Sequence, residues 1–285
     1  MTPTTNVTVI GTGAIGSEVA TTLMSAGHRV VVWNRTPSRM ADLVAAGAAA
    51  APTPAEAARS AELVLATLTD YAAVDDVLRA AGDGLAGRTV VVLSTGTPDE
   101  ARRAAAVAEQ HGAAYLDAGV RTAPDDIGTD RASFLFSGPR EVFDRHREVL
   151  QRLGGSRHVG EAPEAAATWD LLLFGIWYDA QLGLLRALAE AQRAGLDLAE
   201  LADAAVIQLG HVVDAARSTA AEVGDQAYPR GPADLREHLA VVEQLERARI
   251  GGPLGTGGLA DVRRRLEQAI AAGHGEKGLT ALTAV

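Results

Sequence analysis

The feature that most restricts the fold is a short β-branched run that leads directly into a patterned group of glycines. Residues Val7 to Ile10 read V-T-V-I, and Gly11 to Gly16 read G-T-G-A-I-G. A strand followed at once by this spacing predicts a tight turn and then a helix, which we expect to run to about Ala26. The chain therefore begins with a strand–turn–helix unit, typical of a parallel sheet covered by helices.

The same alternation continues through the first half of the chain. Further strands are expected at residues 28–33, 63–68, 90–94, 114–117 and 133–137, and helices at 37–46 and 140–153 among others. Beyond Gly160 the pattern becomes helical, beginning with a long helix from Glu164 to about Ala194, with breaks at Gly195, 228–232 and 251–258. We expect an α/β N-terminal domain, residues 1–162, followed by an all-α C-terminal domain, residues 163–285, joined by the long interdomain helix.

Composition narrows the functional classes. The 285 residues carry a formal net charge of −10, which argues against nucleic-acid binding through a basic surface. There is no cysteine, and the seven histidines show no H-x-x-x-H or H-x-H spacing, so no metal site is predicted. The first strand leaves no room for a signal peptide, and no uninterrupted apolar run approaches the roughly 20 residues that cross a bilayer. We expect a cytoplasmic protein without a membrane partner.

The glycine pattern is specific because of its context, directly after a strand and at the start of a helix. Gly11 makes the tight turn of a Rossmann fold, Gly13 lets the backbone approach a pyrophosphate, and Gly16 lets helix and strand pack closely. The free amides of the helix start then face the phosphates. A glycine-rich turn without a ligand is the alternative. The predicted dinucleotide contacts are Gly11, Thr12, Gly13, Ala14, Ile15 and Gly16.

The end of the second strand predicts which dinucleotide binds. An NAD site places an acid there, roughly 20 residues past the glycines, whereas this chain reads N-R-T-P-S-R at residues 34–39. Thr36 is expected to cap the following helix with Pro37 in its first turn. Arg35 and Arg39 then lie where the helix dipole disfavours cations, a conflict that a 2′-phosphate would relieve. We predict NADPH, bound by Asn34, Arg35, Thr36 and Arg39; two solvated surface arginines are the alternative.

Asp170 lies on the predicted long helix among large apolar residues. At 3.6 residues per turn it shares a face with Phe174, Trp177, Tyr178 and Gln181. An unpaired carboxylate in such surroundings has a raised pKa, as acid–base residues often do, although the helix dipole alone also favours an acid near a helix start. Asp170 and Tyr178, about 12 Å apart along the axis, could bracket a ligand. They are the candidate catalytic residues, and the other three are candidate substrate contacts.

Longer motifs across the whole chain resemble the imine reductases and reductive aminases, relatives of the β-hydroxyacid dehydrogenases. They include L-S-T-G-T-P at 93–98, I-G-T-x-x-A-x-x-L-x-S-G at 127–138, A-A-G-H-G-E-K-G-L-T-A-L at 271–282, and the spacing of Asp170 and Tyr178. The resemblance implies NADPH-dependent reduction of imines or iminiums, with amine and carbonyl as further substrates. It also implies a homodimer that exchanges helical domains around the active-site cleft. Further cofactor contacts are expected at Leu68, Thr69, Val74 and Thr95.

Three positions differ from the related patterns. β-Hydroxyacid dehydrogenases place a lysine where this chain has Asp170, and a carboxylate suits a cationic iminium better than a developing alkoxide. Thr95 stands where the family has Asn or Ser. Arg121 stands where relatives carry an apolar residue, in the expected wall of the substrate cleft. An NADP-dependent dehydrogenase of small β-hydroxy acids, with Arg121 holding the carboxylate, and an NADP(H)-binding sensor without turnover remain the alternatives.

Overall fold

The computed structural model describes residues 4–285, which form two compact units, the first ending at Gly175 and the second running from Ile176 to Val285. The first unit is built on one eight-stranded sheet in the order β3-β2-β1-β4-β5-β6-β7-β8. Its strands are β1 (Asn6–Ile10), β2 (Arg29–Trp33), β3 (Ala49–Ala50), β4 (Leu63–Ala66), β5 (Thr89–Val92), β6 (Ala114–Val120), β7 (Ser133–Ser137) and β8 (Gly155–Gly160). All neighbouring pairs are parallel except β6 and β7.

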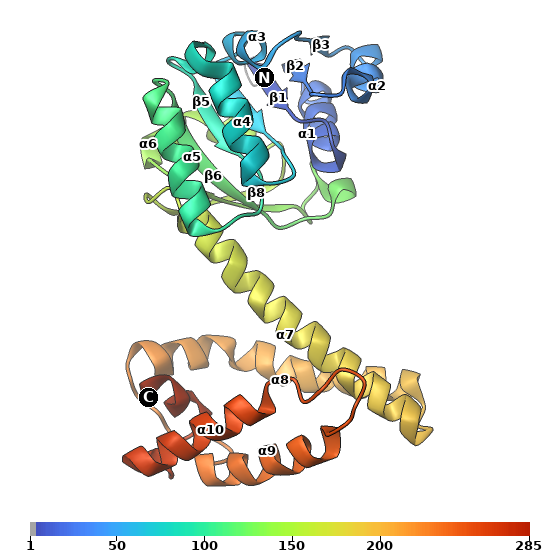
Figure 1. The fold of residues 1–285 in the computed structure, drawn as a ribbon, viewed down its shortest axis with the longest axis vertical. Coiled ribbons are helices and arrows are strands. Elements are labelled where there is room, and N and C mark those ends of the chain that lie inside the picture. Colours follow the sequence, from blue (N-terminus) through green and yellow to red (C-terminus); the bar gives the residue numbers. More distant parts are fainter. Residues whose placement is uncertain (1–3) are drawn as a thin grey trace. The chain divides into compact units, whose positions relative to one another are not determined.

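Helices cover the two faces of this sheet (Figure 1). They are α1 (Ala14–Ser25), α2 (Ala41–Ala45), α3 (Pro54–Arg59), α4 (Tyr71–Ala81), α5 (Pro98–Gln110) and α6 (Arg140–Leu150), with 3₁₀ turns at Pro37–Met40, Gly82–Leu85 and Pro124–Asp126. Local caps fix where they begin. The Asp70 side chain accepts from the amide of Ala73 at the start of α4, and Thr97 and Glu100 form a capping box at α5.

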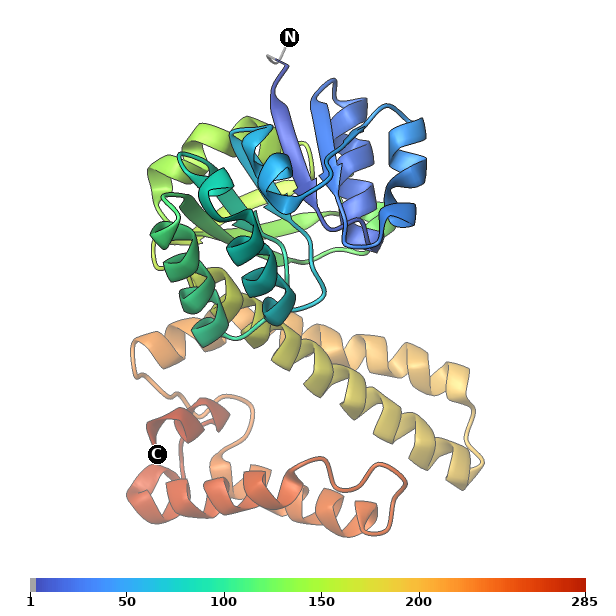
Figure 2. The same cartoon turned by 45° about the horizontal axis from the view of Figure 1, so that its top comes forward.

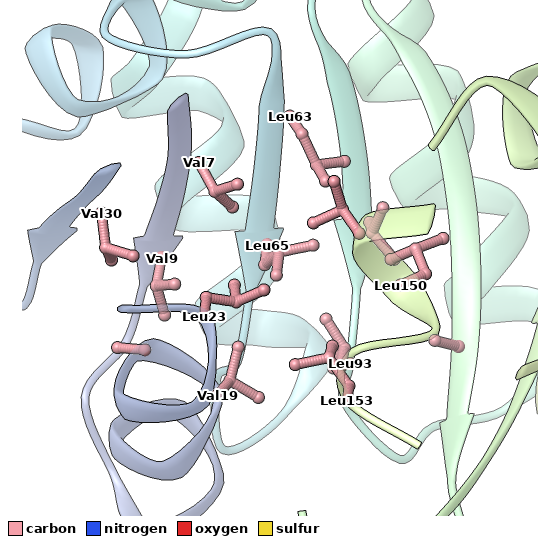
Figure 3. Close-up of a cluster of buried hydrophobic side chains, with 14 of the residues drawn as sticks. Val7, Val9, Val19, Leu23, Val30, Leu63, Leu65, Leu93, Leu150 and Leu153 are labelled. Carbon is pink, nitrogen blue, oxygen red and sulfur yellow. The ribbon is translucent and has the colours of Figure 1, made fainter. Parts of the chain in front are cut away.

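Each face of the sheet has its own apolar core. On one face β1, β4 and α1 contribute fully buried side chains, and Figure 3 shows Val9, Leu23 and Leu65 close together there. On the other face α3, α4 and α5 pack on the same strands, with Leu78 and Leu85 almost completely buried. Because the strands are covered on both faces, they read as nearly continuous apolar runs, which is why the sequence revealed them.

The strand order places β1 at a topological switch point. From β1 the chain moves outward through β2 and β3 on one side, then returns to β4, β5 and β6 on the other. Ligands of open α/β sheets bind at the carboxyl ends of the strands beside such a switch. The turns after β1, β2, β4 and β5 therefore meet at the edge where the glycine pattern lies.

The predicted α/β domain followed by an all-α domain is confirmed, and several local predictions need correction. Two strands were missed: β3 has only two residues, and β8 (G-S-R-H-V-G) is too polar and glycine-rich to stand out. The helix expected at 37–46 is a 3₁₀ turn followed by the five-residue α2. The helix expected to reach residue 153 ends at Leu150, because the chain turns there to enter β8.

The second unit is helical throughout. It contains the later part of α7 (Ala165–Ala194), then α8 (Leu198–Gly224), α9 (Leu235–Arg249) and α10 (Leu259–Ala269), with short helical turns at Ile270–His274 and Leu279–Ala284. Figure 1 shows α9 and α10 side by side, Figure 2 shows the same pair turned by 45°, and the two helices share a small core around Leu235 and Leu266. Among the described helices, α7 alone is long and apolar enough, by length and composition, to cross a membrane.

Candidate functional site

The glycine turn after β1 has the shape that a dinucleotide requires. Gly11 has φ +93°, and a Cβ there would lie 2.3 Å from the Thr67 carbonyl oxygen. A Cβ on Gly16 would lie 2.0 Å from the carbonyl oxygen of Gly11, so helix α1 packs against the turn only because Gly16 has no side chain. A Cβ on Gly13, by contrast, would meet nothing within 4 Å. The residues thus fit a pyrophosphate above Gly13, against the first amides of α1.

Asn34 ties the glycine turn to the loop after β2. Its Oδ1 accepts from the amide of Thr12 at 3.2 Å, and its Nδ2 donates to the carbonyl oxygen of Thr36 at 3.1 Å. Thr36 occupies the cap position before Pro37, but its side chain makes no capping hydrogen bond, which corrects the sequence prediction. Arg39 lies in the last turn of the 3₁₀ turn Pro37–Met40 instead of opening a long helix, so the predicted conflict with a helix dipole does not arise. What remains is two exposed guanidinium groups, Arg35 and Arg39, and no acid.

The loops after β4 and β5 complete this edge of the sheet. The Ser94 hydroxyl accepts from the amide of Leu68 at 3.3 Å and donates to its carbonyl oxygen at 2.9 Å, which holds the two loops together. Leu68 is half-buried, and Thr69 and Thr95 are exposed. Val74 is different: its side chain is 0% exposed in the core under α4. The predicted contact of Val74 with the cofactor is therefore wrong, because this side chain has no surface to offer.

Asp170 is the most buried carboxylate of α7, with a relative exposure of 2%. Its Oδ1 accepts from Nη1 of Arg121 at 3.4 Å, while its buried Oδ2 has no hydrogen-bond partner among residues 4–285. Burial raises the pKa of Asp170, and the smaller opposing effects come from Arg121 and then Thr95. Gly119 of β6 packs closely against Asp170, because a Cβ there would lie 3.1 Å from the Asp170 Cβ, tighter than an ordinary contact.

Arg121 contacts two of the predicted site residues at once. Its guanidinium pairs with Asp170 and lies over the ring of Phe174, 4.6 Å from the centroid. The Arg121 side chain is 24% exposed, so part of it stays open to solvent. The first unit thus brings together Asp170, Arg121 and Phe174, with Thr95 near the carboxylate.

The other predicted residues of α7 lie beyond Gly175, in the second unit. Trp177 and Tyr178 are about half exposed and pack edge to face, with ring centroids 4.9 Å apart. Gln181 is partly buried. All three follow Asp170 on the same continuous helix.

One buried polar cluster in the first unit was not predicted from the sequence. Asp117 of β6 is 1% exposed and accepts hydrogen bonds from the hydroxyl groups of Tyr71 and, at 3.2 Å, Tyr115. Burial raises the pKa of Asp117 to about 7, although the hydrogen bonds oppose this rise. The signal was available: an acid in the middle of the strand A-Y-L-D-A-G-V, with a tyrosine two residues earlier on the same face.

Two family models cover almost the whole chain. The NAD binding domain of 6-phosphogluconate dehydrogenase matches residues 6–160. The C-terminal domain of NADPH-dependent reductive aminase-like proteins matches residues 162–285. The two matches adjoin each other near the start of α7.

Known proteins match over the same length. The chain is 32% identical to an NADPH-dependent reductive aminase of Aspergillus oryzae over 279 residues, 96% of this chain and 94% of that protein. The structure of an imine reductase from Bacillus cereus BAG3X2 superposes with a TM-score of 0.89 at 32% identity, covering 98% of both chains. A reductive aminase from Aspergillus terreus, solved in complex with NADPH and ethyl-5-oxohexanoate, gives a TM-score of 0.89 at 31% identity over 98% of both chains. The chain belongs to the family of NADPH-dependent reductive aminases and imine reductases.

Proposed function

We propose that this chain reduces carbon–nitrogen double bonds with NADPH, and also joins amines to carbonyl compounds by reducing the imine that they form. The observation that carries the proposal is the Asp170 carboxyl group. It is buried, it has one unpaired oxygen, and it lies near Thr95 at the edge of the sheet where the glycine turn opens. A carboxyl group in that position suits a nitrogen that gains positive charge during the reaction.

Reduction of an imine adds a hydride to carbon and a proton to nitrogen. NADPH, when bound, supplies the hydride. Because burial raises its pKa, Asp170 can hold a proton closer to neutral pH than an ordinary aspartic acid and deliver it to a neutral imine nitrogen. Once ionised, the same group stabilises a cationic iminium. We assign Tyr178, with Trp177 and Gln181, to orienting the substrate.

We assign the 2′-phosphate of the cofactor to Arg35 and Arg39. Both side chains are exposed at the end of β2, where an NAD-specific site carries an acid. Asn34 and Thr36 hold this loop against the glycine turn. Guanidinium groups bind phosphate well because their planar donors match its oxygens.

We infer that substrates carrying an anionic group are preferred. The Arg121 guanidinium offsets the charge of Asp170, so an iminium that is only cationic meets a nearly neutral pair. A substrate with both an iminium and a carboxylate complements both residues. Phe174 holds the guanidinium in place through its ring face.

We further propose a cytoplasmic homodimer that exchanges its helical domains, with the domain boundary near residues 162 and 163. No residue of α8, all of which the structure describes, is buried. Five large apolar side chains of α7 and α8 are at least 67% exposed: Ile176, Val206, Ile207, Val212 and Val213. An apolar surface of this kind calls for a partner, and a second copy would cover it without requiring a membrane. Light scattering that finds an active monomer would contradict the dimer.

The activity is tested by following NADPH consumption with 1-pyrroline, with 1-pyrroline-2-carboxylate and with pairs of carbonyl compound and amine. We expect turnover with imines and none with β-hydroxy acids plus NADP⁺. Turnover of β-hydroxy acids alone would instead establish a dehydrogenase. Tight NADPH binding without turnover on the whole panel would indicate a sensor.

A further inference from the structure

The buried cluster around Asp117 contacts the beginning of α7. Besides the two tyrosine hydroxyl groups, the backbone amide of Ala167 lies close enough to its carboxylate to oppose the rise of the Asp117 pKa, and Ala167 packs in the same buried cluster as Tyr71 and Tyr115. Ala167 lies in the first turn of α7, where amides have no partner within the helix. The amide of Ala166 donates to the Ser137 hydroxyl group at 2.8 Å. The helix that carries Asp170 is therefore capped by side chains from the sheet.

The two caps come from directly paired positions. Asp117 of β6 and Ser137 of β7 are partners in the antiparallel register. The Ser137 hydroxyl group also donates to the carbonyl oxygen of Pro163 at 2.9 Å, just before the helix. Ala166 and Ala167 are 0% and 4% exposed, so the first turn of α7 packs closely on the sheet. The position of this turn is set by that packing together with the polar contacts.

Strand β6 presents two successive positions to the same helix. Side chains two residues apart on a strand point to the same face, so Gly119 follows Asp117 on the side that α7 covers. Asp117 contacts the first turn of the helix, and Gly119 contacts Asp170 one turn later. We therefore expect a displacement of the first turn to move the Asp170 carboxyl group as well.

The other end of the cluster reaches the loop after β5. Tyr71 donates to Asp117 from the first turn of α4. Its ring packs against Gly96, where a Cβ would lie only 2.3 Å from the Tyr71 Cδ2 atom. Gly96 follows Thr95, which lies near Asp170. The cluster therefore connects the two segments that we assign to the reaction, the Thr95 loop and the Asp170 turn.

We propose that Asp117 is a positioning residue, which holds the first turn of α7 through the amide of Ala167 and so fixes the Asp170 carboxyl group relative to Thr95. The positioning role rests on the proposed function, whereas the capping contact does not. Burial also raises the pKa of the Tyr71 and Tyr115 hydroxyl groups, so both remain donors to Asp117 at neutral pH. Asp117, Tyr71 and Tyr115 are all buried, with relative exposures of 1%, 5% and 6%, so we assign the cluster a positioning role and no contact with the substrate.

The test compares Asp117→Asn with Asp75→Asn. Asp75 lies on α4, one turn after Tyr71, and its exposed carboxylate forms an ion pair only with Arg79 within the described chain. Amide hydrogen exchange of the first two turns of α7 reads the capping contact. We expect about 10-fold faster exchange there in Asp117→Asn and no change in Asp75→Asn. Unchanged exchange in Asp117→Asn would refute the capping role.

The second readout is turnover of the imine that the unmodified protein reduces best. Misplacing a reacting group by about 1 Å costs up to about 100-fold, so we expect kcat to fall 10- to 100-fold while the NADPH Kd stays within about twofold. Faster exchange with an unchanged kcat would show that the cap is only structural and would overturn the positioning role. If the unmodified protein reduces no imine, the proposed function fails, while the exchange data still test the cap.

A second variant keeps the test decisive if Asp117→Asn does not fold. Tyr115→Phe removes one donor to Asp117, and we expect the same changes in exchange and in kcat, each about threefold weaker.

Discussion

The guanidinium of Arg121 lies 3.4 Å from the buried carboxylate of Asp170, so the residue that we assign to proton delivery is already paired with a cation. The two side chains are buried to different degrees, because Asp170 is 2% exposed and Arg121 is 24% exposed. Arg121 can therefore turn toward a substrate while Asp170 stays in place. The ion pair of Arg121 and Asp170 therefore determines the net charge of the surface that a substrate contacts.

Arg121→Met should change substrate preference more than basal chemistry. We expect kcat/KM for 1-pyrroline-2-carboxylate to fall by about 10-fold or more, as for a lost charge-assisted hydrogen bond, and that for neutral 1-pyrroline to change little. Removing the cation also removes an influence that lowers the pKa of Asp170, so the alkaline limb of the pH–rate profile should move to higher pH. Equal losses on the two imines would show that Arg121 does not bind a carboxylate.

Replacing both Arg35 and Arg39 with alanine should weaken the binding of NADPH and leave the binding of NADH nearly unchanged. Because the two guanidinium groups are exposed at the end of β2 and would face only the 2′-phosphate, we expect a higher KM for NADPH and a nearly unchanged KM for NADH. Steady-state kinetics with both cofactors measure this. Arg59→Ala, on the short helix α3, is the matched control. If both cofactors lose affinity equally, the phosphate assignment is wrong.

Asp117 should make folding stability depend on pH. Its pKa rises from an ordinary 3.8 to about 7 on folding, so between these values the folded chain holds a proton that the unfolded chain has lost. The free energy of unfolding should then fall by up to about 1.4 kcal/mol for each unit of rising pH. The groups facing Asp117, Tyr71 and Tyr115, do not titrate there because their own pKa values are raised.

Urea unfolding at about pH 5 and about pH 7 measures this dependence. Asp117→Asn should remove that part of the pH slope, and the exposed Asp75→Asn should retain it. A variant Asp117→Asn with the full slope would show that another group titrates on folding.

The sequence predicted the fold well where local pattern decides structure. The strands of the parallel sheet read as apolar runs because both faces are covered, and the glycine turn was recognisable because steric limits at Gly11 and Gly16 leave no other residue possible. It failed at β8, whose residues G-S-R-H-V-G owe their strand conformation to pairing with β7. It failed at Val74 for a similar reason, since only tertiary packing decides whether a helix residue faces the core or the cofactor.

The candidate site shows the same division. Asp170 could be found from its apolar helix face. Its pairing with Arg121, which is 49 residues away in the chain and directly follows β6, depends on how β6 and α7 pack. Asp117 and Tyr115 lie on one face of β6 and could have been read from the sequence, whereas Tyr71 and the amide of Ala167 come close to Asp117 only through the fold. Long-range contacts of this kind are set by the fold, and a single sequence does not contain them in readable form.

Asp170→Asn keeps the shape of the side chain and removes its acid–base function. NADPH binding should persist, because no contact of the glycine turn changes, whereas turnover of a neutral imine should fall by about 10²–10⁴. Tyr178→Phe should lower the turnover of this imine less than Asp170→Asn does. An N-methyl iminium of the same ring needs no proton, so it should be less affected by Asp170→Asn than the neutral imine. Equal loss on both would point to charge stabilisation in place of proton delivery.

One complication of this variant can be removed by design. Asp170→Asn leaves the Arg121 guanidinium without its acid, and an unpaired cation beside an iminium would itself slow the reaction. Comparing Arg121→Met with the double variant Arg121→Met/Asp170→Asn isolates the carboxyl group, because the cation is absent from both. If turnover of the neutral imine is the same in these two proteins, Asp170 has no role in proton delivery, and its burial serves only the packing of α7 against Gly119.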